Sequence, residues 1–393
     1  MERLSLSPQD PDFIQNPYPA YAEARARGPV LFWEDYEMAA AFDAATVQAL
    51  LRDRRLGRAP LTEASLSYPD HLSDWAMAER HSMLDMEPPQ HTRLRGLVLR
   101  AFTSRRIADL RADIAEVTEA LLAALPGDTF DLIPAFCTQL PVRIIARLLG
   151  VPEEIWPDLL RWSNAMVAMY QAGRTRATEV SANTAAAEFS QFLRAYIERR
   201  RADPRDDLIT QLIAAEEEGE RLSADELIGT CILLLNAGHE ATVHSLGNAT
   251  SCLLGHGTPA AAFAPDRIEA TVEELLRYDP PLHLFTRIAY EEIDLGPHRL
   301  KRGQQIALVL GSAGRDPALW DKPDTFDPAR PVRPHAAFGG GLHFCVGAPL
   351  ARLELQMALP ALFRHLPDMQ LAAPPRYAPT YHFHKLDRLM ITP

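Results

Sequence analysis

The sequence has few cysteines, and none of them forms a closely spaced pair. Four are scattered along 393 residues without a Cys-x-x-Cys motif: Cys137, Cys231, Cys252 and Cys345. This spacing provides neither the framework of a disulfide-stabilised domain nor the ligand pairs of a zinc knuckle. Each cysteine therefore has to be interpreted from its own surroundings.

The chain also lacks an excess of positive charge and an apolar N-terminal run. Its 52 acidic and 40 basic residues leave a formal net charge of -12, which argues against nucleic acid as a general partner. The first residues, Met1 to Pro8, contain no apolar segment of the signal-peptide or anchor type. We expect a soluble, cytoplasmic protein of bacterial type, with no membrane anchor and no nucleic-acid partner.

No internal repeat, low-complexity tract or long linker interrupts the sequence. Its length is compatible with two or three domains, although large single domains also occur. A composition of 47% hydrophobic and 23% charged residues indicates a sizeable core and little disorder. We expect one domain that covers residues 1–393.

Helical patterns dominate the sequence that is present. They cover residues 17–27, 45–52, much of 107–150 and most of 153–201, and Gly150 and Pro152 stop one of them. Shorter apolar runs at 31–33, 38–42 and 305–310 are typical of strands. The pattern favours a mostly α fold with small β-sheets.

The stretch from Gly57 to Met86 shows no regular period. Its apolar residues are scattered between Pro60 and Pro69 and beyond. A long irregular stretch in a compact domain is often a binding loop, but a tolerated surface insertion explains it equally well. The residues alone leave both interpretations open.

The most distinctive stretch runs from Phe338 to Gly347, where three consecutive glycines precede Cys345. Glycine lets the backbone approach closely, and a helix starting at Ala348-Pro349 would direct its N-terminal dipole at the sulfur. This arrangement suits a metal held by one thiolate whose charge is damped by N–H groups. A buried cysteine beside a flexible turn remains the alternative. A phosphate-binding loop is disfavoured, because no Lys-Ser or Lys-Thr follows the glycines.

A long apolar run from Leu227 to about Leu254 is the second unusual segment. Ser223 and Glu226 precede it in the form of a capping box, and its all-round apolarity predicts a helix buried in the domain. Glu240 lies in the middle of this run, where a carboxylate is costly unless it is paired or used. A salt bridge to a neighbouring helix and a catalytic role both remain open. Gly238 permits a local distortion or the close approach of a flat ligand.

The segment between His91 and Ala108 is basic in an otherwise acidic chain. His91 and Arg95 are four residues apart and share one face of the expected helix. The segment has no acidic residue and contains five arginines: Arg93, Arg95, Arg100, Arg105 and Arg106. An arginine that binds a carboxylate in bidentate fashion can fix an anionic cofactor. An ordinary solvated helix is the alternative.

Phe338, Gly341, His343, Cys345 and Gly347 together resemble the haem-binding signature of the cytochrome P450 family, the haem-thiolate monooxygenases. The resemblance implies the fold of that family, in which haem b lies between a long central helix and the cysteine loop. It implies that Cys345 is the iron ligand. It also places Phe338, His343 and Gly347 among the cofactor-binding residues.

Further matches extend the resemblance back to His91. His91, Arg95 and Arg287 match the residues that bind the haem propionates in the family. Glu274 and Arg277 match a buried pair that the family completes with a later arginine, here Arg330. The resemblance implies that these three brace the cysteine loop.

The segment Ala237–Thr242 resembles the family's oxygen-activation motif in the central helix. This implies that Ala237 contacts the cofactor and that Glu240 and Thr242 are catalytic. The family usually has a threonine directly after the acid, but here Ala241 takes that position. Thr242 lies about 100° further round the helix and cannot simply replace the missing hydroxyl. The usual proton relay is therefore in doubt.

Several residues would surround the substrate if the resemblance holds. The candidates are Trp162, Met166, Met169 and Tyr170 on a mobile lid, residues 282–285 beside the haem, and a turn tip at 381–384. For the aromatic and methionine stripe, ordinary core packing is the alternative, because residues at helical spacing more often form core than pocket. For the tip, the alternative is an unremarkable hairpin.

The implied function is the insertion of one oxygen atom from dioxygen into a C–H or C=C bond of a largely apolar small molecule. Because no reductase domain is fused to the chain, electrons would come from a ferredoxin-like donor with its own reductase. The expected docking face carries Arg93, Arg100, Arg105 and Arg106. Two alternatives remain: a peroxide-using or substrate-assisted haem-thiolate enzyme, suggested by Ala241, and a non-catalytic haem-binding or sensing protein.

Overall fold

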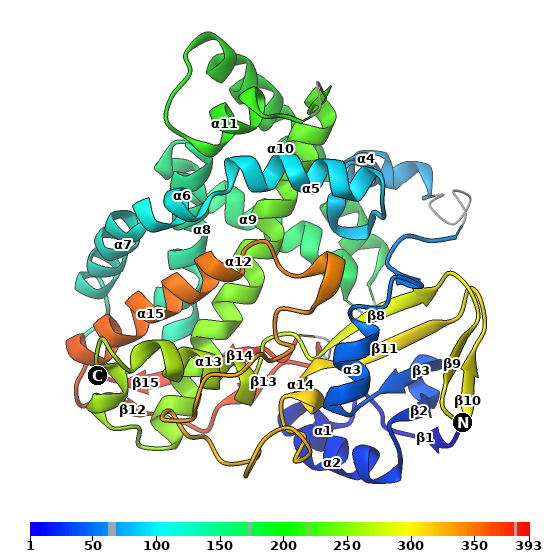
Figure 1. Ribbon diagram of the computed structural model, residues 1–393. Helices are drawn as coiled ribbons and strands as arrows, with labels where there is room; N and C mark the ends of the chain where they lie inside the picture. Colours follow the sequence, from blue (N-terminus) through cyan, green and yellow to red (C-terminus); the bar gives the residue numbers. More distant parts are fainter. Residues whose placement is uncertain (62–67, 172–173, 218–219, 381–382) are drawn as a thin grey trace.

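The computed structural model describes residues 1–61, 68–171, 174–217, 220–380 and 383–393. Helices form most of it, and the largest sheet lies to one side together with the N-terminus (Figure 1). The mostly α fold with small sheets is therefore confirmed. The helices are α1 (Pro11–Gln15), α2 (Tyr18–Arg27), α3 (Ala44–Leu50), α4 (Ser73–Arg80), α5 (Gln90–Ala101), α6 (Ser104–Asp109), α7 (Arg111–Ala123), α8 (Gln139–Leu149), α9 (Trp156–Val167), α10 (Arg176–Ala202), α11 (Leu208–Ala214), α12 (Ala224–Gly255), α13 (Ile268–Tyr278), α14 (Leu310–Ala313) and α15 (Ala348–His365).

The strands are short and form one mixed sheet and four smaller ones. The largest sheet has the order β1-β2-β3-β11-β8-β4, in which β2 pairs antiparallel with β3, and β11 joins β3 in parallel and β8 antiparallel. Its register sets Arg287 of β8 opposite Ile306 of β11. The strands are β1 (Arg3–Leu4), β2 (Val30–Trp33), β3 (Met38–Ala41), β4 (Leu56–Gly57), β5 (Phe130–Asp131), β6 (Glu216–Glu217), β7 (Glu220–Arg221), β8 (Leu284–Ala289), β9 (Ile293–Leu295), β10 (His298–Leu300), β11 (Gln305–Val309), β12 (Gln370–Leu371), β13 (Arg376–Tyr377), β14 (Leu386–Arg388) and β15 (Met390–Thr392).

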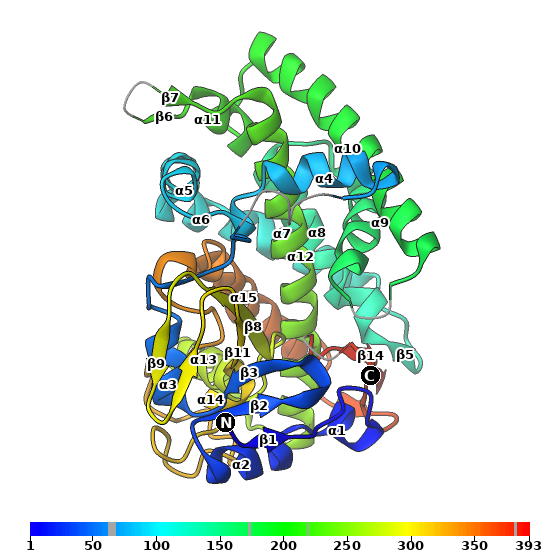
Figure 2. The ribbon, with the colours of Figure 1, turned by 90° about the vertical axis from the view of Figure 1, so that its right-hand side faces the viewer.

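The helix α12 passes through the middle of the molecule and is surrounded by other helices (Figure 2). The predicted capping box is present: the Ser223 hydroxyl accepts from the Glu226 amide, and the Glu226 carboxylate accepts from the Ser223 amide. The cap satisfies donors that the first turn would otherwise leave unpaired. It fixes the start of the helix that carries the candidate catalytic residues.

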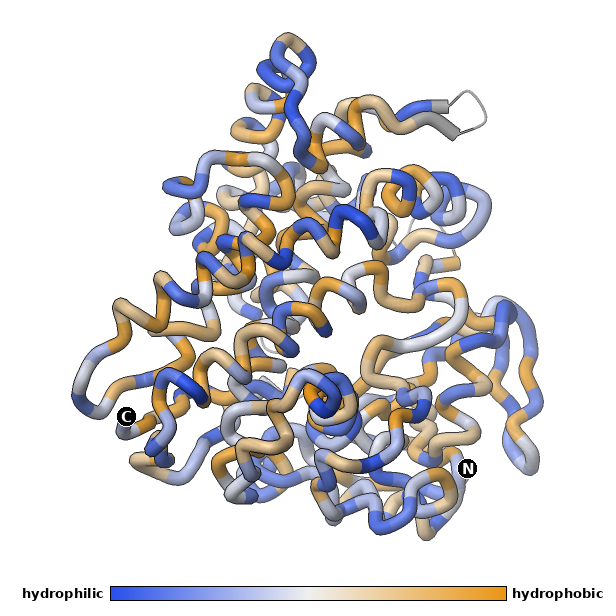
Figure 3. The backbone as a smooth tube through the Cα atoms, turned by 60° about the vertical axis from the view of Figure 1, so that its left-hand side comes forward, coloured by the Kyte–Doolittle hydropathy of each residue, from blue (hydrophilic) through white to orange (hydrophobic). Residues whose placement is uncertain are grey.

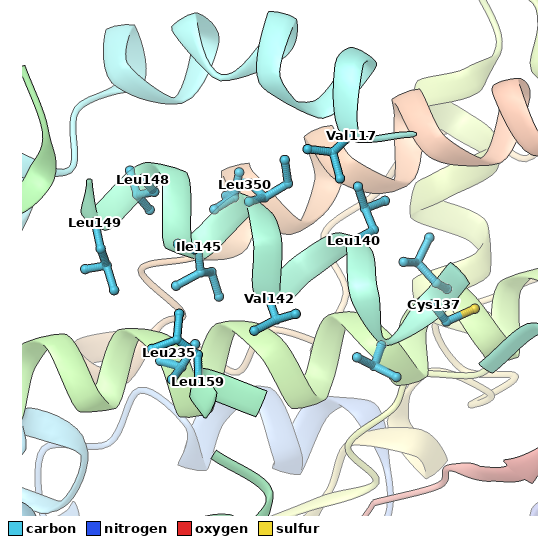
Figure 4. Close-up of a cluster of buried hydrophobic side chains, with 14 of the residues drawn as sticks. Val117, Cys137, Leu140, Val142, Ile145, Leu148, Leu149, Leu159, Leu235 and Leu350 are labelled. Atoms are coloured by element: carbon cyan, nitrogen blue, oxygen red, sulfur yellow. The ribbon is translucent and has the colours of Figure 1, made fainter. Parts of the chain in front are cut away.

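Apolar side chains from several helices meet along one side of α12. Val117 of α7, Ile145 of α8, Leu159 of α9, Leu235 of α12 and Leu350 of α15 are all buried in one cluster (Figure 4). Hydrophilic and hydrophobic residues alternate along the outer helices, so each helix has one face for this core (Figure 3). The burial of these side chains fixes the position of α15, and with it the position of the preceding cysteine loop.

The expectation of an irregular stretch from Gly57 to Met86 was partly wrong. The segment contains the helix α4, flanked by short 3-10 turns at Asp70–Leu72 and Met83–Asp85. Leu72 and Trp75 are buried in the core, and α4 packs against α10. Tertiary packing, which a short window of sequence does not reveal, therefore stabilises this helix. Part of the stretch lies outside the described residues.

The remaining local predictions agree with the structure. The expected helices at 17–27 and 45–52 are α2 and α3, and the two stretches within 153–201 are α9 and α10. The expected strands at 31–33, 38–42 and 305–310 are β2, β3 and β11. In the described part of the chain, no helix has the length and apolar character needed to cross a membrane.

Candidate active site

The loop that carries Cys345 is held in one conformation by its glycines. Gly339 and Gly341 have φ angles of 70° and 65°, a left-handed region that side chains disfavour. A Cβ on Gly341 would lie 2.5 Å from the carbonyl oxygen of Leu51, so only glycine fits against the end of α3. The amide of Cys345 donates to the carbonyl of Phe338 over 3.1 Å and closes the loop. The three glycines therefore form a rigid support for the cysteine.

Cys345 lies just before α15 and is an exposed residue, whereas Cys137 and Cys231 are buried. Surrounding protein raises the pKa of the Cys345 thiol, but the amides of Gly347 and Ala348 and the nearby Arg95 guanidinium act to lower it. The predicted helix start at Ala348 is confirmed. The loop thus presents an exposed cysteine with N–H donors directed at its sulfur.

Helix α5 lies against the same loop. Nη2 of Arg95 donates to the carbonyl oxygen of Phe344 over 2.7 Å. The rings of His91 and His343 have centroids 4.4 Å apart, and Nε2 of His343 lies 2.9 Å from Oε1 of Glu87. The structure therefore brings together His91, Arg95 and the cysteine loop, which are some 250 residues apart in sequence. Glu87, which lies just before α5, is a contact that sequence reasoning missed.

Two polar groups near this loop have donor capacity that the protein does not use. The guanidinium of Arg287 is buried, and its one hydrogen bond among the described residues reaches the carbonyl of neighbouring Thr286 at 2.9 Å. Burial lowers the pKa of Arg287 to about 10. Nδ1 of His91 is buried and has no partner among the described residues, and burial together with the nearby His343 lowers the pKa of His91 to about 4. A buried guanidinium without a carboxylate fits an anionic ligand.

One face in the middle of α12, the open face, is less buried than the positions around it. Ala237 is exposed, and Leu233, Leu234 and Ala241 are partly buried. These positions are three to four residues apart and therefore share a face. The helix presents only alkyl groups on this face, which suits contact with a flat apolar ligand.

Gly238 has a different role from the one expected. A Cβ at this position would lie 2.8 Å from Cδ1 of Ile145 on α8, so the missing side chain makes room for a neighbouring helix. The helix α12 is continuous from Ala224 to Gly255. The close approach at Gly238 is thus between two helices, and the α-helix is not interrupted there.

Glu240 is buried and paired, as a carboxylate in such a helix must be. Oε1 accepts from Nε2 of His244 over 3.0 Å and from Nζ of Lys385 over 3.3 Å. Burial alone would raise the pKa of Glu240, but the His244 hydrogen bond and the Lys385 charge outweigh it and lower the pKa to about 2. The cationic partner of Glu240 is thus Lys385 of the C-terminal segment. The salt bridge considered from the sequence was one to a neighbouring helix.

The hydroxyl of Thr242 is already engaged. It donates to the carbonyl oxygen of Gly238 over 2.8 Å, one turn back along the helix. Ala241 lies on the open face and carries no hydroxyl. Within the motif, therefore, no threonine side chain faces the open side beside Glu240.

The predicted brace below the cysteine loop is confirmed as a contact. Nε and Nη2 of Arg277 donate to the two carboxylate oxygens of Glu274 over 2.6 and 2.7 Å, and Nε of Arg330 lies 3.0 Å from Oε2. The side chains of Arg277 and Glu274 are almost completely buried. Arg277 also donates to the carbonyls of Gly314 and Pro323. This network joins α13 to the chain that leads into the loop.

A second carboxylate on α13 contributes to the same support and was missed. Glu273 accepts from Nε of Arg352 over 2.5 Å and lies 3.1 Å from Nε2 of His335. Burial opposes ionisation, but His335 and Arg352 outweigh it and lower the pKa of Glu273 to about 2. The guanidinium of Arg352 lies 4.5 Å from the ring centroid of Phe338. Phe338 is thus held by a cation that Glu273 positions.

The stripe of pocket candidates on α9 belongs mainly to the core. Trp162 stacks on Phe189 with centroids 5.0 Å apart, and Met166 and Met169 are buried. Tyr170 is partly exposed and donates to Glu79. Nδ2 of Asn236 on α12 lies 3.8 Å from the sulfur of Met166.

The C-terminal tip is anchored beside α12. Phe383 forms an isolated bridge with Leu282, while Tyr381 and His382 lie outside the described residues. Nδ1 of His384 lies 2.9 Å from Oδ1 of Asp279, and His283 completes a group whose geometry could hold a metal. Both oxygens of Asp279 already accept hydrogen bonds from tyrosine hydroxyls, Oδ1 from Tyr18 at 2.5 Å and Oδ2 from Tyr377 at 2.9 Å. We interpret the group as a hydrogen-bonded anchor for the tip.

The basic face is less available than the sequence indicated. Arg93 forms an ion pair with Glu226, and Arg106 forms one with Asp206 and also contacts Gln211. Arg105 is exposed. Acidic residues from distant parts of the chain thus neutralise two of the four arginines, which the local sequence did not reveal.

Comparison with known proteins gives a consistent result. Residues 268–370, which include the brace and the cysteine loop, match the family model "Cytochrome P450". The chain is 34% identical to the biotin biosynthesis cytochrome P450 of Bacillus subtilis over 99% of both chains. It is 37% identical to the cytochrome P450 monooxygenase PikC of Streptomyces venezuelae, over 95% of this chain and 89% of that one. It is 36% identical to the 6-deoxyerythronolide B hydroxylase of Saccharopolyspora erythraea, over 90% and 89%.

Solved structures agree with the sequence relatives. The crystal structure of P450BioI in complex with a hexadec-9Z-enoic acid ligated acyl carrier protein matches with a TM-score of 0.90 and 34% identity, over 97% of this chain and 99% of that chain. The crystal structure of CalO2 matches with a TM-score of 0.91 and 30% identity, over 99% and 98%. The sequence relatives named above share more than 30% identity with this chain over 90% or more of its length, which establishes its family. The chain belongs to the cytochrome P450 family of haem-dependent monooxygenases.

Proposed function

We propose that this cytochrome P450 binds haem b with Cys345 as the axial iron ligand. The exposed cysteine and the amides of Gly347 and Ala348 directed at its sulfur support this role. Phe338 and His343 belong to the same loop and complete the cofactor-binding surface. Ala237, on the open face of α12, provides the opposite wall. When bound, a haem with a thiolate ligand supplies the dioxygen chemistry, because the thiolate donates electron density that favours O–O cleavage.

His91, Arg95 and Arg287 would bind the two propionates. The observation in favour is the buried guanidinium of Arg287 without a carboxylate partner among the described residues, together with the unpaired Nδ1 of His91. Arg95 is fixed next to the cysteine loop by its bond to Phe344. The pairing of a guanidinium with a carboxylate provides both charge compensation and orientation.

The reaction that we propose is insertion of one oxygen atom from dioxygen into a C–H or C=C bond of a largely apolar small molecule. The observation that carries this proposal is the alkyl face of α12, made of Leu233, Leu234, Ala237 and Ala241, in a chain that also presents the Cys345 sulfur. An apolar wall orients an apolar substrate and excludes water. Relatives carry names as different as a vitamin D(3) 25-hydroxylase and a polyketide biosynthesis enzyme, so we propose the substrate only as a class.

A substrate-assisted variant of this reaction is the second candidate, and Ala241 favours it. Glu240 would be the acid of the proton path, but Ala241 beside it has a methyl group in place of a hydroxyl. A hydroxyl on the substrate, or an ordered water, would complete the path. Thr242 can join it only when its hydroxyl leaves the carbonyl of Gly238. A peroxide-using enzyme would not need this path, so activity with hydrogen peroxide as the only oxidant tests that alternative.

Electrons would come from a ferredoxin-like donor with its reductase, and we propose that the reaction takes place in the cytoplasm. The docking face that we propose is centred on the exposed Arg105. Arg93 and Arg106 contribute less charge because Glu226 and Asp206 pair with them. The positive charge on this face would attract the acidic surface of the electron donor and orient it during encounter.

The carbon monoxide spectrum of the reduced protein tests the assignment of Cys345. Thiolate ligation gives a red-shifted band, which should be lost in Cys345→Ala and retained in Cys252→Ala. Retention of the band in Cys345→Ala would contradict the assignment. Products formed from hexadec-9Z-enoic acid, testosterone and vitamin D3 with a ferredoxin system then test the reaction. Related proteins were solved with an acyl carrier protein ligated to the first compound and in complex with the second, and one relative is a vitamin D(3) 25-hydroxylase.

A further inference from the structure

Lysine is rare in this chain and occurs at one chemically distinctive place. Only Lys301, Lys322 and Lys385 occur among 40 basic residues. Among the ion pairs that the described residues form, the pair of Lys385 with Glu240 is the one that uses a lysine, and all others use arginine or histidine. A chain that uses arginine for nearly every salt bridge has a lysine at the buried acid of its oxygen-activation motif.

Lys385 connects this acid with the edge of the protein. Its Nζ lies 3.3 Å from Oε1 of Glu240, and 20% of its side chain is exposed, against 10% for Glu240. The pair spans 145 residues of sequence. The lysine stem therefore extends from the solvent side to the carboxylate, as long aliphatic stems commonly do.

Neighbouring contacts hold the backbone of Lys385 in place. Nδ2 of Asn248 on α12 donates to the carbonyl of His384 over 2.8 Å, and the ring of Phe383 packs edge-on against His244 with centroids 5.9 Å apart. Nδ1 of His384 is held by Asp279. The residues before Lys385 are thus fixed to α12 and α13, so the ammonium group is directed at Glu240 by a rigid segment.

Lysine and arginine differ in the property that matters at this place. Both supply a positive charge and hydrogen-bond donors, but a guanidinium does not release its proton in proteins, whereas an ammonium group can. For charge compensation alone, arginine would serve, as it does for Glu274 and Glu273. The choice of lysine is explained if the group has to deliver a proton.

We propose that Lys385 supplies protons to Glu240 during turnover. A proton moves from Nζ of Lys385 to Oε1 of Glu240, and the ammonium charge that lowers the pKa of this carboxyl group disappears in the same step. The carboxyl group then releases the proton on the side of the open face, and the amine of Lys385 takes a proton from water. Each cycle leaves both residues unchanged, and the electrons come from the redox partner of the family's reaction. This inference rests on the role of Glu240 in the proposed function.

The charged and titratable groups around Glu240 are few. His239 and His244 belong to α12, and Lys385 comes from the C-terminal segment. Burial lowers the pKa of His244 and of His239, the latter to about 4. Among the described residues, Lys385 is the lysine or arginine in contact with Glu240. It is a positioning and proton-supplying residue, because it acts through Glu240.

The contact itself can be tested without turnover. Protein labelled with 15N at lysine Nζ has three side-chain signals, since the chain has three lysines. The signal lost in Lys385→Arg identifies Lys385. In Glu240→Gln, that signal should shift while those of Lys301 and Lys322 remain unchanged. No shift would show that the two residues do not interact in solution, and would overturn the proposal.

Turnover then separates proton delivery from charge. We would measure peroxide released per dioxygen consumed, with a ferredoxin system and hexadec-9Z-enoic acid, in Lys385→Arg, Lys385→Met and the exposed control Lys301→Arg. A general acid or base contributes about 10²-fold or more to a reaction rate. Because water can partly replace Lys385 as a source of protons, we expect a smaller effect, roughly a tenfold loss of coupling, in both Lys385 variants. The solvent deuterium isotope effect should increase in both, and Lys301→Arg should match the wild type.

The outcomes distinguish this inference from the proposed function. If Lys385→Arg couples like the wild type while Glu240→Gln does not, charge alone is needed and the inference is overturned, whereas the role of Glu240 stands. If Glu240→Gln also couples like the wild type, the proposed proton path itself fails. The carbon monoxide band and the thermal midpoint of each variant show that the haem site has folded, and Lys385→Met repeats the test if the longer arginine distorts the contact.

Discussion

Glu274 and Glu240 are buried carboxylates on the neighbouring helices α13 and α12, yet their partners differ in kind. Glu274 lies between two arginines, and the guanidinium of Arg277 is also bound by backbone carbonyls. Glu240 has a buried histidine and a partly exposed lysine, both on the same oxygen. A guanidinium keeps its protons, so the first network can only support structure. An ammonium group that reaches solvent can exchange protons, so the second network can also carry them.

The largest effect should follow from breaking the first network. Glu274→Gln leaves the buried Arg277 without a compensating charge, which costs about 3–5 kcal/mol in comparable buried pairs. We expect a large drop in thermal midpoint and in haem bound per chain. Glu269→Gln is the matched control, because it lies exposed on the same helix. Equal haem content in Glu274→Gln and wild type would contradict the structural role.

A third buried carboxylate, Glu354, extends the comparison, because it forms no ion pair among the described residues. Burial raises the pKa of Glu354 to about 8. The folded state therefore favours the protonated form, and the stability that this contributes is complete below about pH 4.5 and is lost as pH rises through 8. Relative to its stability at pH 5, Glu354→Gln should gain about 4 kcal/mol over the wild type by pH 9. Denaturant unfolding at both pH values measures this, and parallel pH dependences would contradict it.

Glu240→Gln should change turnover more than stability. The substitution removes the acid, while Lys385 can turn to water because it is partly exposed. We expect product formation to fall at least about tenfold, with a change in thermal midpoint much smaller than that of Glu274→Gln. If Glu240→Gln lost as much thermal stability as Glu274→Gln and still turned over normally, Glu240 would have the structural role and this prediction would be wrong.

Ala241→Thr adds the hydroxyl that the family usually has beside the acid. With an apolar compound that carries no hydroxyl, the new group should lower peroxide release by roughly two- to fivefold, because one donor of the proton path is restored. Ala241→Val is the control for volume, since valine has the shape of threonine without the hydroxyl. Equal peroxide release from wild type and Ala241→Thr would show that position 241 does not limit the path.

The smallest effect concerns the surface arginines, where solvent screens the charge. Arg105→Glu should slow electron transfer from a ferredoxin a few-fold at low ionic strength and have little effect at high salt. Arg106→Glu is less informative, because Asp206 already pairs with Arg106. Stopped-flow reduction at two ionic strengths measures both. Salt-independent rates would exclude an electrostatic docking face at Arg105.

The sequence by itself determined the features that depend on local spacing. The glycines before Cys345, the capping box at Ser223 and the pair Glu274–Arg277 lie within a few residues of one another, so chain geometry alone brings them together. Arg330 was expected from family resemblance and lies in contact with Glu274. The replacement of the usual threonine by Ala241 is also visible in the sequence.

Only the tertiary structure decided which distant residues pair. Lys385 and Glu240 are 145 positions apart, and Glu273 finds Arg352 after 79. Arg93 and Arg106 appeared to be free surface charges until folding brought Glu226 and Asp206 beside them. Gly238 was expected to permit a local distortion or the close approach of a flat ligand, but the space at this position is taken by Ile145 of α8. Local patterns specify helices and loops, whereas the partner of a buried charge depends on how those helices pack, because any nearby cation in the folded chain can satisfy it.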